Sequence, residues 1–176
     1  MASAPAAPLT RYASRITLQL RNRQRDRRLN IPFLRNVLRY VFTEQLRVPT
    51  ADLCFHFVTA EEMARVNWQF LQHEGSTDVI TFDYGERSAV SGQRSAVLNG
   101  EAFICVADAV KQAREFKTSW QSEVVRYAVH AVLHLRGYDD LQPARRRVMK
   151  REENRLVREL AAAFDLDQLE TRNSKP

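Results

Sequence analysis

The sequence predicts a single α+β domain in which a mixed sheet of about four strands is packed by about five helices. Three observations carry this prediction. The chain has 176 residues, of which 44% are hydrophobic, and this suits one domain with its own core. Segments with the alternating pattern of strands interleave with segments of helical spacing. There is no internal repeat, no second core pattern and no run of 18 apolar residues, which excludes a membrane-spanning helix.

Hydrophobic spacing predicts the first three elements. Residues 16–21 alternate apolar and polar side chains, which indicates a half-buried strand. Apolar side chains then recur at helical spacing between Pro32, which suits a first helical turn, and Pro49. The mostly apolar run over residues 51–58 indicates a second strand.

Capping and turn residues predict the next two elements. Thr59, followed three residues later by Glu62, forms a capping box that opens a helix through about Leu71. Gly75 then breaks the chain before a third strand over residues 78–84. The order up to this point is strand, helix, strand, helix, strand.

A polar loop separates the third strand from the fourth. Residues 85–99 contain Gly and Ser and indicate a hairpin-like connection. Residues 100–106 form the fourth expected strand. Asp108 is the expected cap of a short helix that ends near Phe116.

Two longer helices complete the predicted domain. Either Thr118 or Ser119 caps a helix that runs to Leu135. The last helix is expected over residues 143–164, and residues 166–176 are expected to form a frayed tail. The folded domain is therefore predicted to cover residues 15–165.

Positive charge is concentrated near the N-terminus. The chain carries 27 Lys and Arg against 21 Asp and Glu, and residues 1–30 hold seven arginines and one aspartate. Residues 1–14 are rich in Ala and Pro, which predicts a disordered extension; an organelle transit peptide is the alternative. A basic cluster follows and indicates contact with a polyanion, nucleic acid above all, or else a solvated surface. The cluster consists of Arg21, Arg23, Arg25, Arg27 and Arg28.

The two cysteines point to a reducing compartment. Cys54 and Cys105 stand alone in apolar stretches without a CxxC pairing, so buried free thiols are expected. We therefore expect a cytoplasmic protein.

A candidate metal site lies at the C-terminal end of the helix that stops at Leu135. His130 and His134 are four residues apart and share one helix face, so they can hold one ion. Gly137 favours a left-handed turn that ends the helix and returns the chain. The reversal brings either Asp139 or Asp140 toward the imidazoles. Two histidines and one carboxylate leave a coordination position open for water, as catalytic zinc sites do.

These residues also carry a resemblance to a known family. The run HAVLHLRGYDD at residues 130–140 resembles the HGxLHLxGYDH motif of the YbeY endoribonucleases, which are associated with ribosomal RNA maturation. Upstream, Asn67 and the run STDVITF at residues 76–82 are similar to the family's LN and PTDVLSF segment. The run GEAFI at residues 100–104 resembles its GDIxI strand. Met149 with Glu152 or Glu153 matches the spacing in its last helix. The resemblance covers roughly residues 14–164.

The resemblance implies a zinc-dependent endoribonuclease that prefers single-stranded RNA. One zinc ion per chain is expected on His130, His134 and Asp140, because Asp140 occupies the position of the family's third histidine. A metal-bound water would then be the reactive group in phosphodiester cleavage. The implied partners are ribosomal RNA and ribosomal particles, with roles in ribosomal RNA maturation and ribosome quality control. The arginine cluster 21–28 is the first expected RNA contact, since acids interleave with the cations of the last helix.

Two departures from the family pattern affect the expected site. Asp140 replaces a neutral histidine with a negative ligand, which reduces the charge of the metal centre by one. Leu71 stands where the family has an arginine that assists phosphate binding or catalysis, so the catalytic side chains stay unassigned. Either another basic residue supplies the missing charge, for which the candidates are Arg65, Arg94 and Arg136, or the activity is weak.

Two other function classes stay open from the sequence. A non-catalytic, ribosome-associated RNA-binding factor would keep zinc for structure, and Leu71 would mark its lost activity. A metal-dependent hydrolase of another substrate is the third class, but Ala131 stands where metalloproteases of the HExxH type carry their general base. The ligand set also suits Fe(II), Mn(II) or Ni(II).

Overall fold

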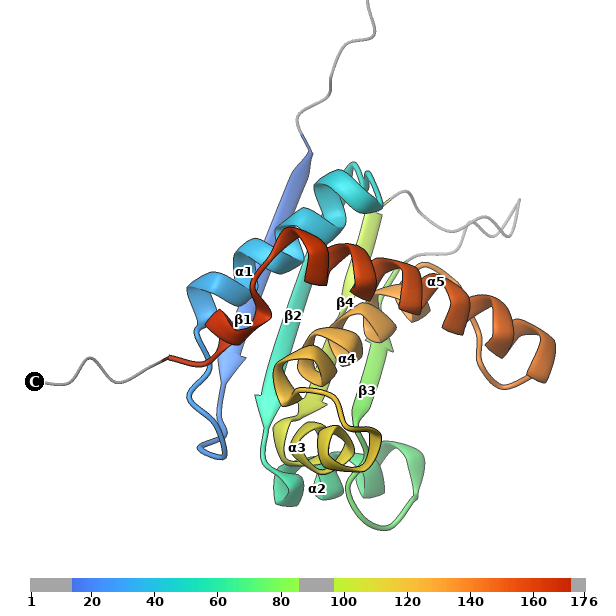
Figure 1. Cartoon of the computed structure of the whole chain (residues 1–176). Helices are drawn as coiled ribbons and strands as arrows, with labels where there is room; N and C mark the ends of the chain where they lie inside the picture. Colours follow the sequence, from blue (N-terminus) through green and yellow to red (C-terminus); the bar gives the residue numbers. More distant parts are fainter. Residues whose placement is uncertain (1–13, 86–96, 172–176) are drawn as a thin grey trace, which may run out of the picture.

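The computed structural model describes residues 14–85 and 97–171, and its centre is a four-stranded mixed sheet (Figure 1). The strands are β1 (Arg15–Asn22), β2 (Thr50–Val58), β3 (Val79–Asp83) and β4 (Val97–Cys105). Their order across the sheet is β1-β2-β4-β3. Strands β1, β2 and β4 run parallel, and β3 pairs antiparallel with β4 at the edge. The predicted fold class is confirmed.

The helices begin and end close to the expected positions. They are α1 (Ile31–Tyr40) with a π-helical extension (Val41–Gln45), α2 (Ala60–Leu71), α3 (Val106–Phe116), α4 (Trp120–Leu135), α5 (Pro143–Ala163) and a short 3-10 helix (Leu166–Leu169). Thr59 caps α2 by accepting from the backbone N–H of Glu62 over 3.2 Å, and Ser119 caps α4 in the same way. Polar caps satisfy N–H groups that the first helical turn leaves unpaired.

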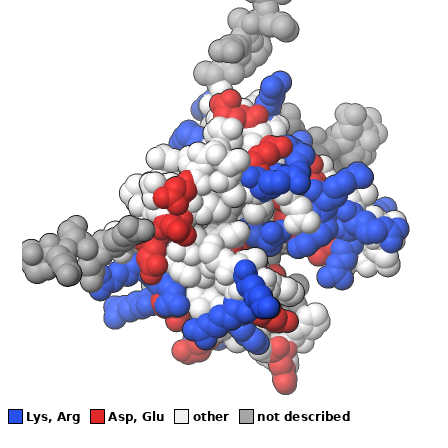
Figure 2. All heavy atoms as spheres, viewed as in Figure 1, with Lys and Arg blue, Asp and Glu red and all other residues white. Residues whose placement is uncertain are grey.

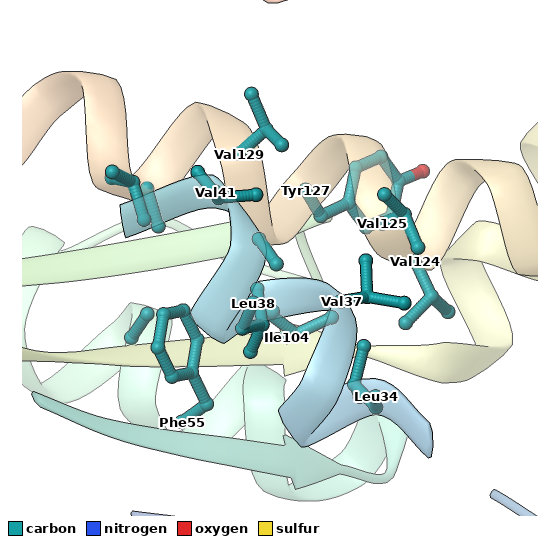
Figure 3. Packing of buried hydrophobic residues seen from close by; sticks show 14 of the residues in the cluster. Leu34, Val37, Leu38, Val41, Phe55, Ile104, Val124, Val125, Tyr127 and Val129 are labelled. Atoms are coloured by element: carbon teal, nitrogen blue, oxygen red, sulfur yellow. The ribbon is translucent and has the colours of Figure 1, made fainter. Parts of the chain in front are cut away.

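The main core lies between one sheet face and a layer formed by α1, α4 and α5. Alternate β2 residues, including Phe55, point into this core together with Ile104 of β4. They meet apolar residues of α1 and α4, which Figure 3 shows packed around Leu38 and Val125. Helix α4 is buried along most of its length, because it lies between the sheet and α5. This burial fixes the helix that carries the candidate metal ligands.

A smaller cluster lies on the opposite face of the sheet. Helix α2 places Met63 against Val58, Ile80 and Cys105 there. Both cysteines are free and buried, as expected. This cluster holds α2 beside β3, so that the end of α2 reaches the neighbourhood of α4.

Gly100 allows the end of α4 to approach the sheet closely. A Cβ atom at this position would lie 2.7 Å from Cδ2 of Leu135 and would collide with the backbone oxygen of Phe82. Real Cβ atoms do not tolerate such contacts. The absence of a side chain at residue 100 therefore lets the last turn of α4 lie against β3 and β4.

Three boundaries differ from the sequence predictions. Strand β4 begins at Val97, so residues 97–99 belong to the sheet rather than to the loop. The predicted cap Asp108 lies inside the first turn of α3, whose N-cap is Cys105 without a side-chain hydrogen bond. The residues after Asp165 are folded rather than frayed: Leu166 and Leu169 are buried, and Glu170 forms an antiparallel β-bridge with Leu29.

The chain is therefore folded through Thr171, where the sequence predicts a frayed tail from residue 166. Residues 1–13 of the predicted N-terminal extension, and residues 86–96 of the predicted loop, lie outside the described residues. Among the helices that are described, none combines the length and the apolar character needed to cross a membrane.

Candidate metal centre

The last turn of α4 presents two histidines to one point. The Nε2 atoms of His130 and His134 are 3.0 Å apart. Gly137 then adopts φ of +94°, and its N–H donates to the carbonyl of His134 over 2.8 Å. This left-handed turn, which only glycine adopts without cost, returns the chain toward the imidazoles.

Asp140 completes a three-residue group with the two histidines. Its Oδ2 atom is 3.7 Å from Nε2 of His130, and its Oδ1 atom is 3.8 Å from Nε2 of His134. One ligand atom from each residue lies within 4.8 Å of the other two. Ligands about 2 Å from a tetrahedral zinc ion are about 3.3 Å apart, so these separations suit a single ion.

The hydrogen bonds of the outer ring nitrogens place both Nε2 lone pairs inside the site. Nδ1 of His134 faces the backbone oxygen of Tyr138 at 3.2 Å, and Nδ1 of His130 faces the carboxylate of Glu153 at 2.9 Å. Both partners only accept, so each Nδ1 carries a proton. When the rings are neutral, both Nε2 lone pairs face the site, and one cation between them can bind both. The donor set fits a metal ion.

Burial favours the neutral, metal-binding form of His134. It lowers the pKa of this imidazole below its ordinary value, and a proton on neighbouring His130 would act in the same direction. Asp140 opposes the shift only in part. Neutral imidazole is the form that binds metals.

Glu153 of α5 orients His130 through a hydrogen bond to Nδ1, the ring nitrogen that faces away from the other two ligands. Its side chain is 2% exposed, and its carboxylate accepts from Nη1 of Arg126 over 2.6 Å and from Nζ of Lys150 over 2.7 Å as well as from His130. Burial alone would raise the pKa of Glu153, but these hydrogen bonds lower it to about 2. The buried charge is therefore compensated. Of the two glutamates that the sequence left open, Glu152 instead pairs with Arg155.

The neighbouring aspartate has a different role. Asp139 accepts from the backbone N–H of Leu141 and forms an ion pair with Arg145 over 3.1 Å. The hydrogen bond from Leu141 is the main cause of its lowered pKa. Asp139 therefore stabilises the return loop, whereas Asp140 faces the histidines.

Two cavities meet at the histidines. A cavity of about 610 Å³ lies between α4, α5 and the end of α3, and one of about 250 Å³ lies along β3. His130 and His134 line both. Leu71, at the end of α2, lines the smaller cavity and is 49% exposed. The position that departs from the family pattern thus lies beside the candidate metal centre.

The cations of the larger cavity are Arg126, Arg146 and Lys150. The sequence analysis missed Arg126 and ranked the cations of the last helix, which include Arg146 and Lys150, behind the N-terminal cluster. The helical spacing of Arg126, four residues before His130, is a signal that could have found it. Of the replacements expected for the missing arginine, Arg65 pairs with Glu61 and Arg136 lines neither cavity. Arg94 lies outside the described residues.

The N-terminal arginine cluster lies apart from the metal group. Its strand β1 is at the opposite edge of the sheet from β3. Arg27 stacks over the ring of Trp120, at the first turn of α4, and His130 is about 15 Å further along that helix. Arg23 forms an ion pair with Glu62 over 2.9 Å. The structure therefore does not bring the two predicted sites together.

His56 of β2 is packed among its neighbours in the folded domain. It is 4% exposed, stacks on Phe103 and hydrogen-bonds to Glu101 over 3.0 Å and to Arg23. Its contacts explain its burial without a ligand.

Comparison with known proteins agrees with these features. A family model described as Endoribonuclease YbeY matches residues 19–161. Two relatives named Endoribonuclease YbeY come from Chlorobium phaeovibrioides, with 33% identity over 84% of this chain and 93% of the relative, and from Salinibacter ruber, with 32% identity over 75% and 84%. The solution structure of TM1509 from Thermotoga maritima is similar in fold, with a TM-score of 0.60, 21% identity and coverage of 92% of this chain and 99% of that one.

Proposed function

The chain belongs to the YbeY family of endoribonucleases, and from this premise we propose that it is a zinc-dependent, single-strand-specific endoribonuclease. The single observation that carries the proposal is the meeting of three ligand atoms, from His130, His134 and Asp140, where two cavities join. Two imidazoles and one carboxylate hold a zinc ion and leave a position open. The open position is what separates a catalytic from a structural site.

The residues of the site have separable tasks in phosphodiester cleavage. A zinc ion bound there supplies a Lewis acid and lowers the pKa of a coordinated water. Glu153 and the backbone of Tyr138 hold the two imidazoles in the neutral tautomer that binds metal. Arg126 and Lys150 neutralise Glu153, so that this buried carboxylate does not repel an RNA phosphate.

The preference for single-stranded RNA is supported by the position of the ligands inside the molecule's surface, where two cavities join. The ligands lie where two cavities join, and β3 and α5 form the walls. A flexible single strand can turn its phosphate toward such a centre, whereas the phosphates of a duplex are held on a stiff surface. Because this preference comes from access of the backbone phosphate, it does not depend on the identity of the bases.

We further propose action on ribosomal RNA within ribosomal particles, in ribosomal RNA maturation and ribosome quality control, in the cytoplasm. The family membership supports this placement. The two buried free thiols agree with a reducing compartment. The arginine cluster Arg21–Arg28 is proposed as an additional contact with the RNA backbone.

The second candidate function is an RNA-binding factor without catalysis. It is favoured by Leu71, which lines the smaller cavity beside both histidines and offers no charge to a phosphate. The deciding experiment compares single-stranded and duplex RNA of one sequence with the wild-type protein and with His134→Ala. Cleavage of the single strand by the wild type only, together with zinc loss in the variant, supports the nuclease. If neither the wild type nor the variant cleaves RNA and both still bind it, the second candidate is supported.

A further inference from the structure

The N-terminal half of α5 carries a strip of cations that its own helix does not favour. No acid occupies the first turn of α5, although the positive end of a helix dipole favours acids and disfavours cations there. Arg146 and Lys150 are four residues apart, as are Arg147 and Arg151, and like charges at this spacing repel. Figure 2 shows the Lys and Arg side chains gathered over this helix.

Most of these cations lack an acidic partner. Within the part of the chain that the structure describes, Arg146, Arg147 and Arg151 form no ion pair. Lys150 pairs with the buried carboxylate of Glu153, Arg145 pairs with Asp139, and Arg155 pairs with Glu152 and Glu159. The unpaired arginines are exposed. Three exposed, unpaired arginines near the positive end of a helix favour an anionic partner.

The strip begins in the larger cavity and continues onto the surface. Arg146 and Lys150 line the cavity that His130, His134 and Asp140 also line. Arg147 and Arg151 follow on the adjacent side of the same helix, about 100° further around its axis. An extended polyanion that crosses the metal centre therefore meets these four side chains in turn.

The charge of the cavity also favours a phosphate chain. Its three cations are matched by three acids, which are Asp78, Asp140 and Glu153. A divalent ion on the ligand group leaves an excess of two positive charges. Phe116 lines the same cavity and is 62% exposed, and an exposed aromatic ring beside cations is the arrangement on which single-stranded bases stack.

We propose that Arg146, Lys150, Arg147 and Arg151 form a track for the backbone of single-stranded RNA, on the side of the metal centre away from Leu71. The inference rests on the proposed nuclease function and adds where the flanking phosphates bind. The track supplies positive charge near the reacting phosphate from α5, in place of the cation absent at residue 71.

The test uses charge reversal at the two track residues that lie outside the cavity. Arg147→Glu with Arg151→Glu is compared with a matched control, Arg39→Glu with Arg158→Glu, which changes the net charge equally at exposed positions away from the cavity. Binding of a labelled oligouridine of about 12 nucleotides is measured by fluorescence anisotropy at several salt concentrations, over incubations in which the oligonucleotide stays intact. Zinc content and thermal unfolding are measured on every variant.

The track variant should bind at least about tenfold more weakly at low salt, and its salt slope should fall by about 1.4, because each lost single-strand phosphate contact removes about 0.7. Its zinc content should equal that of the wild type, and on a longer RNA its loss of cleavage should lie in KM. The control should lose much less affinity. Wild-type affinity and slope in the track variant, or an equal loss in the control, would overturn the track and identify the strip as a surface for another acidic partner.

The outcomes also separate this inference from the proposed function. Cleavage by the wild type together with an unaffected track variant rejects the track and leaves the nuclease standing. Intact RNA with the zinc-loaded wild type, together with weaker binding by the track variant, rejects the nuclease and supports the track as an RNA surface.

Discussion

The carboxylate of Glu153 accepts a hydrogen bond from Nδ1 of His130 over 2.9 Å, although the two residues are 23 positions apart and lie on different helices. The contact joins α5 to the metal-binding turn of α4. It fixes both the orientation and the tautomer of the imidazole.

Glu153→Gln should therefore weaken zinc binding by about 10-fold to 100-fold, as loss of such supporting carboxylates does in other metal sites. The measurement is a competition titration against a chromophoric zinc chelator. Glu152→Gln is the matched control, because Glu152 is adjacent but pairs with Arg155. Equal zinc affinity in the two variants would show that Glu153 does not position the ligand.

The third ligand can be assigned by three substitutions at two positions. Asp140→Ala should reduce zinc affinity sharply, whereas Asp139→Ala should change it little, since Asp139 contacts Arg145 and not the histidines. Asp140→His should retain zinc, because imidazole is an equally good ligand. Zinc content after dialysis decides the matter. If Asp139→Ala alone loses the metal, the ligand is one residue earlier.

Gly100→Ala tests the close approach between α4 and the sheet. The new Cβ must displace Leu135 or the backbone of Phe82, and such overpacking costs about 1–3 kcal/mol. We expect a lower free energy of unfolding in urea and weaker zinc binding, because Leu135 follows directly after His134. Gly75→Ala is the control: it has a φ of +85° but open space around it, so it should destabilise the fold by about 1 kcal/mol and leave zinc binding unchanged.

The pH dependence of stability should include a contribution from His56. Burial lowers the pKa of this imidazole in the folded protein, against the opposing effect of Glu101. The unfolded chain then binds a proton more readily as the pH falls below the ordinary value of 6.5. Stability is therefore complete above that value and is lost as the pH falls toward the lowered pKa.

His56→Gln should be less stable than the wild type at pH 8 but should lose less stability between pH 7 and pH 5. The measurement is urea unfolding of the zinc-free proteins at each pH, which removes the contribution of metal release. His73→Gln, an exposed position in the turn before β3, is the control. A wild-type pH dependence in His56→Gln would assign the effect to other groups.

The arginine cluster near β1 gives a separate prediction for RNA binding. Reversing the charge of Arg23, Arg25 and Arg27 together should weaken binding and reduce the salt slope by about 2, because each single-strand phosphate contact contributes about 0.7. Anisotropy titrations across salt concentrations measure both quantities. An unchanged slope would mean that the cluster is a solvated surface, as the ion pair of Arg23 with Glu62 allows.

The sequence predicted the elements well because their patterns are local. Hydrophobic spacing predicted the first two strands, and turn and loop residues set off the other two. Thr59 was a correct cap, as was Ser119 of the two alternatives for α4, because capping needs only the neighbouring backbone. Asp108 was assigned wrongly, since Val106 already begins the helix directly after β4. Nothing in the local pattern separates those two starting points.

The candidate site was predictable only as far as one helix and its turn. His130, His134 and Asp140 lie within 11 consecutive residues, so helical periodicity and Gly137 bring them together. Lys150 and Glu153 come to the site through the packing of α5 on α4, where Glu153 also meets Arg126 of α4. That packing depends on tertiary contacts such as Leu156 and Leu160 in the core, which no local pattern specifies.

The last described residues of the chain form hydrogen bonds with the residues that precede α1. The N–H of Asn30 donates to the carbonyl of Leu169 over 2.8 Å, and Thr171 donates to Arg28. Leu166 and Leu169 meanwhile fill the core beside α1 and α4. During translation, α1 and the metal-binding helix are made before this closing segment. The native core can therefore be completed only after residue 169 has left the ribosomal exit tunnel, and until then the nascent domain stays open to chaperones and proteases.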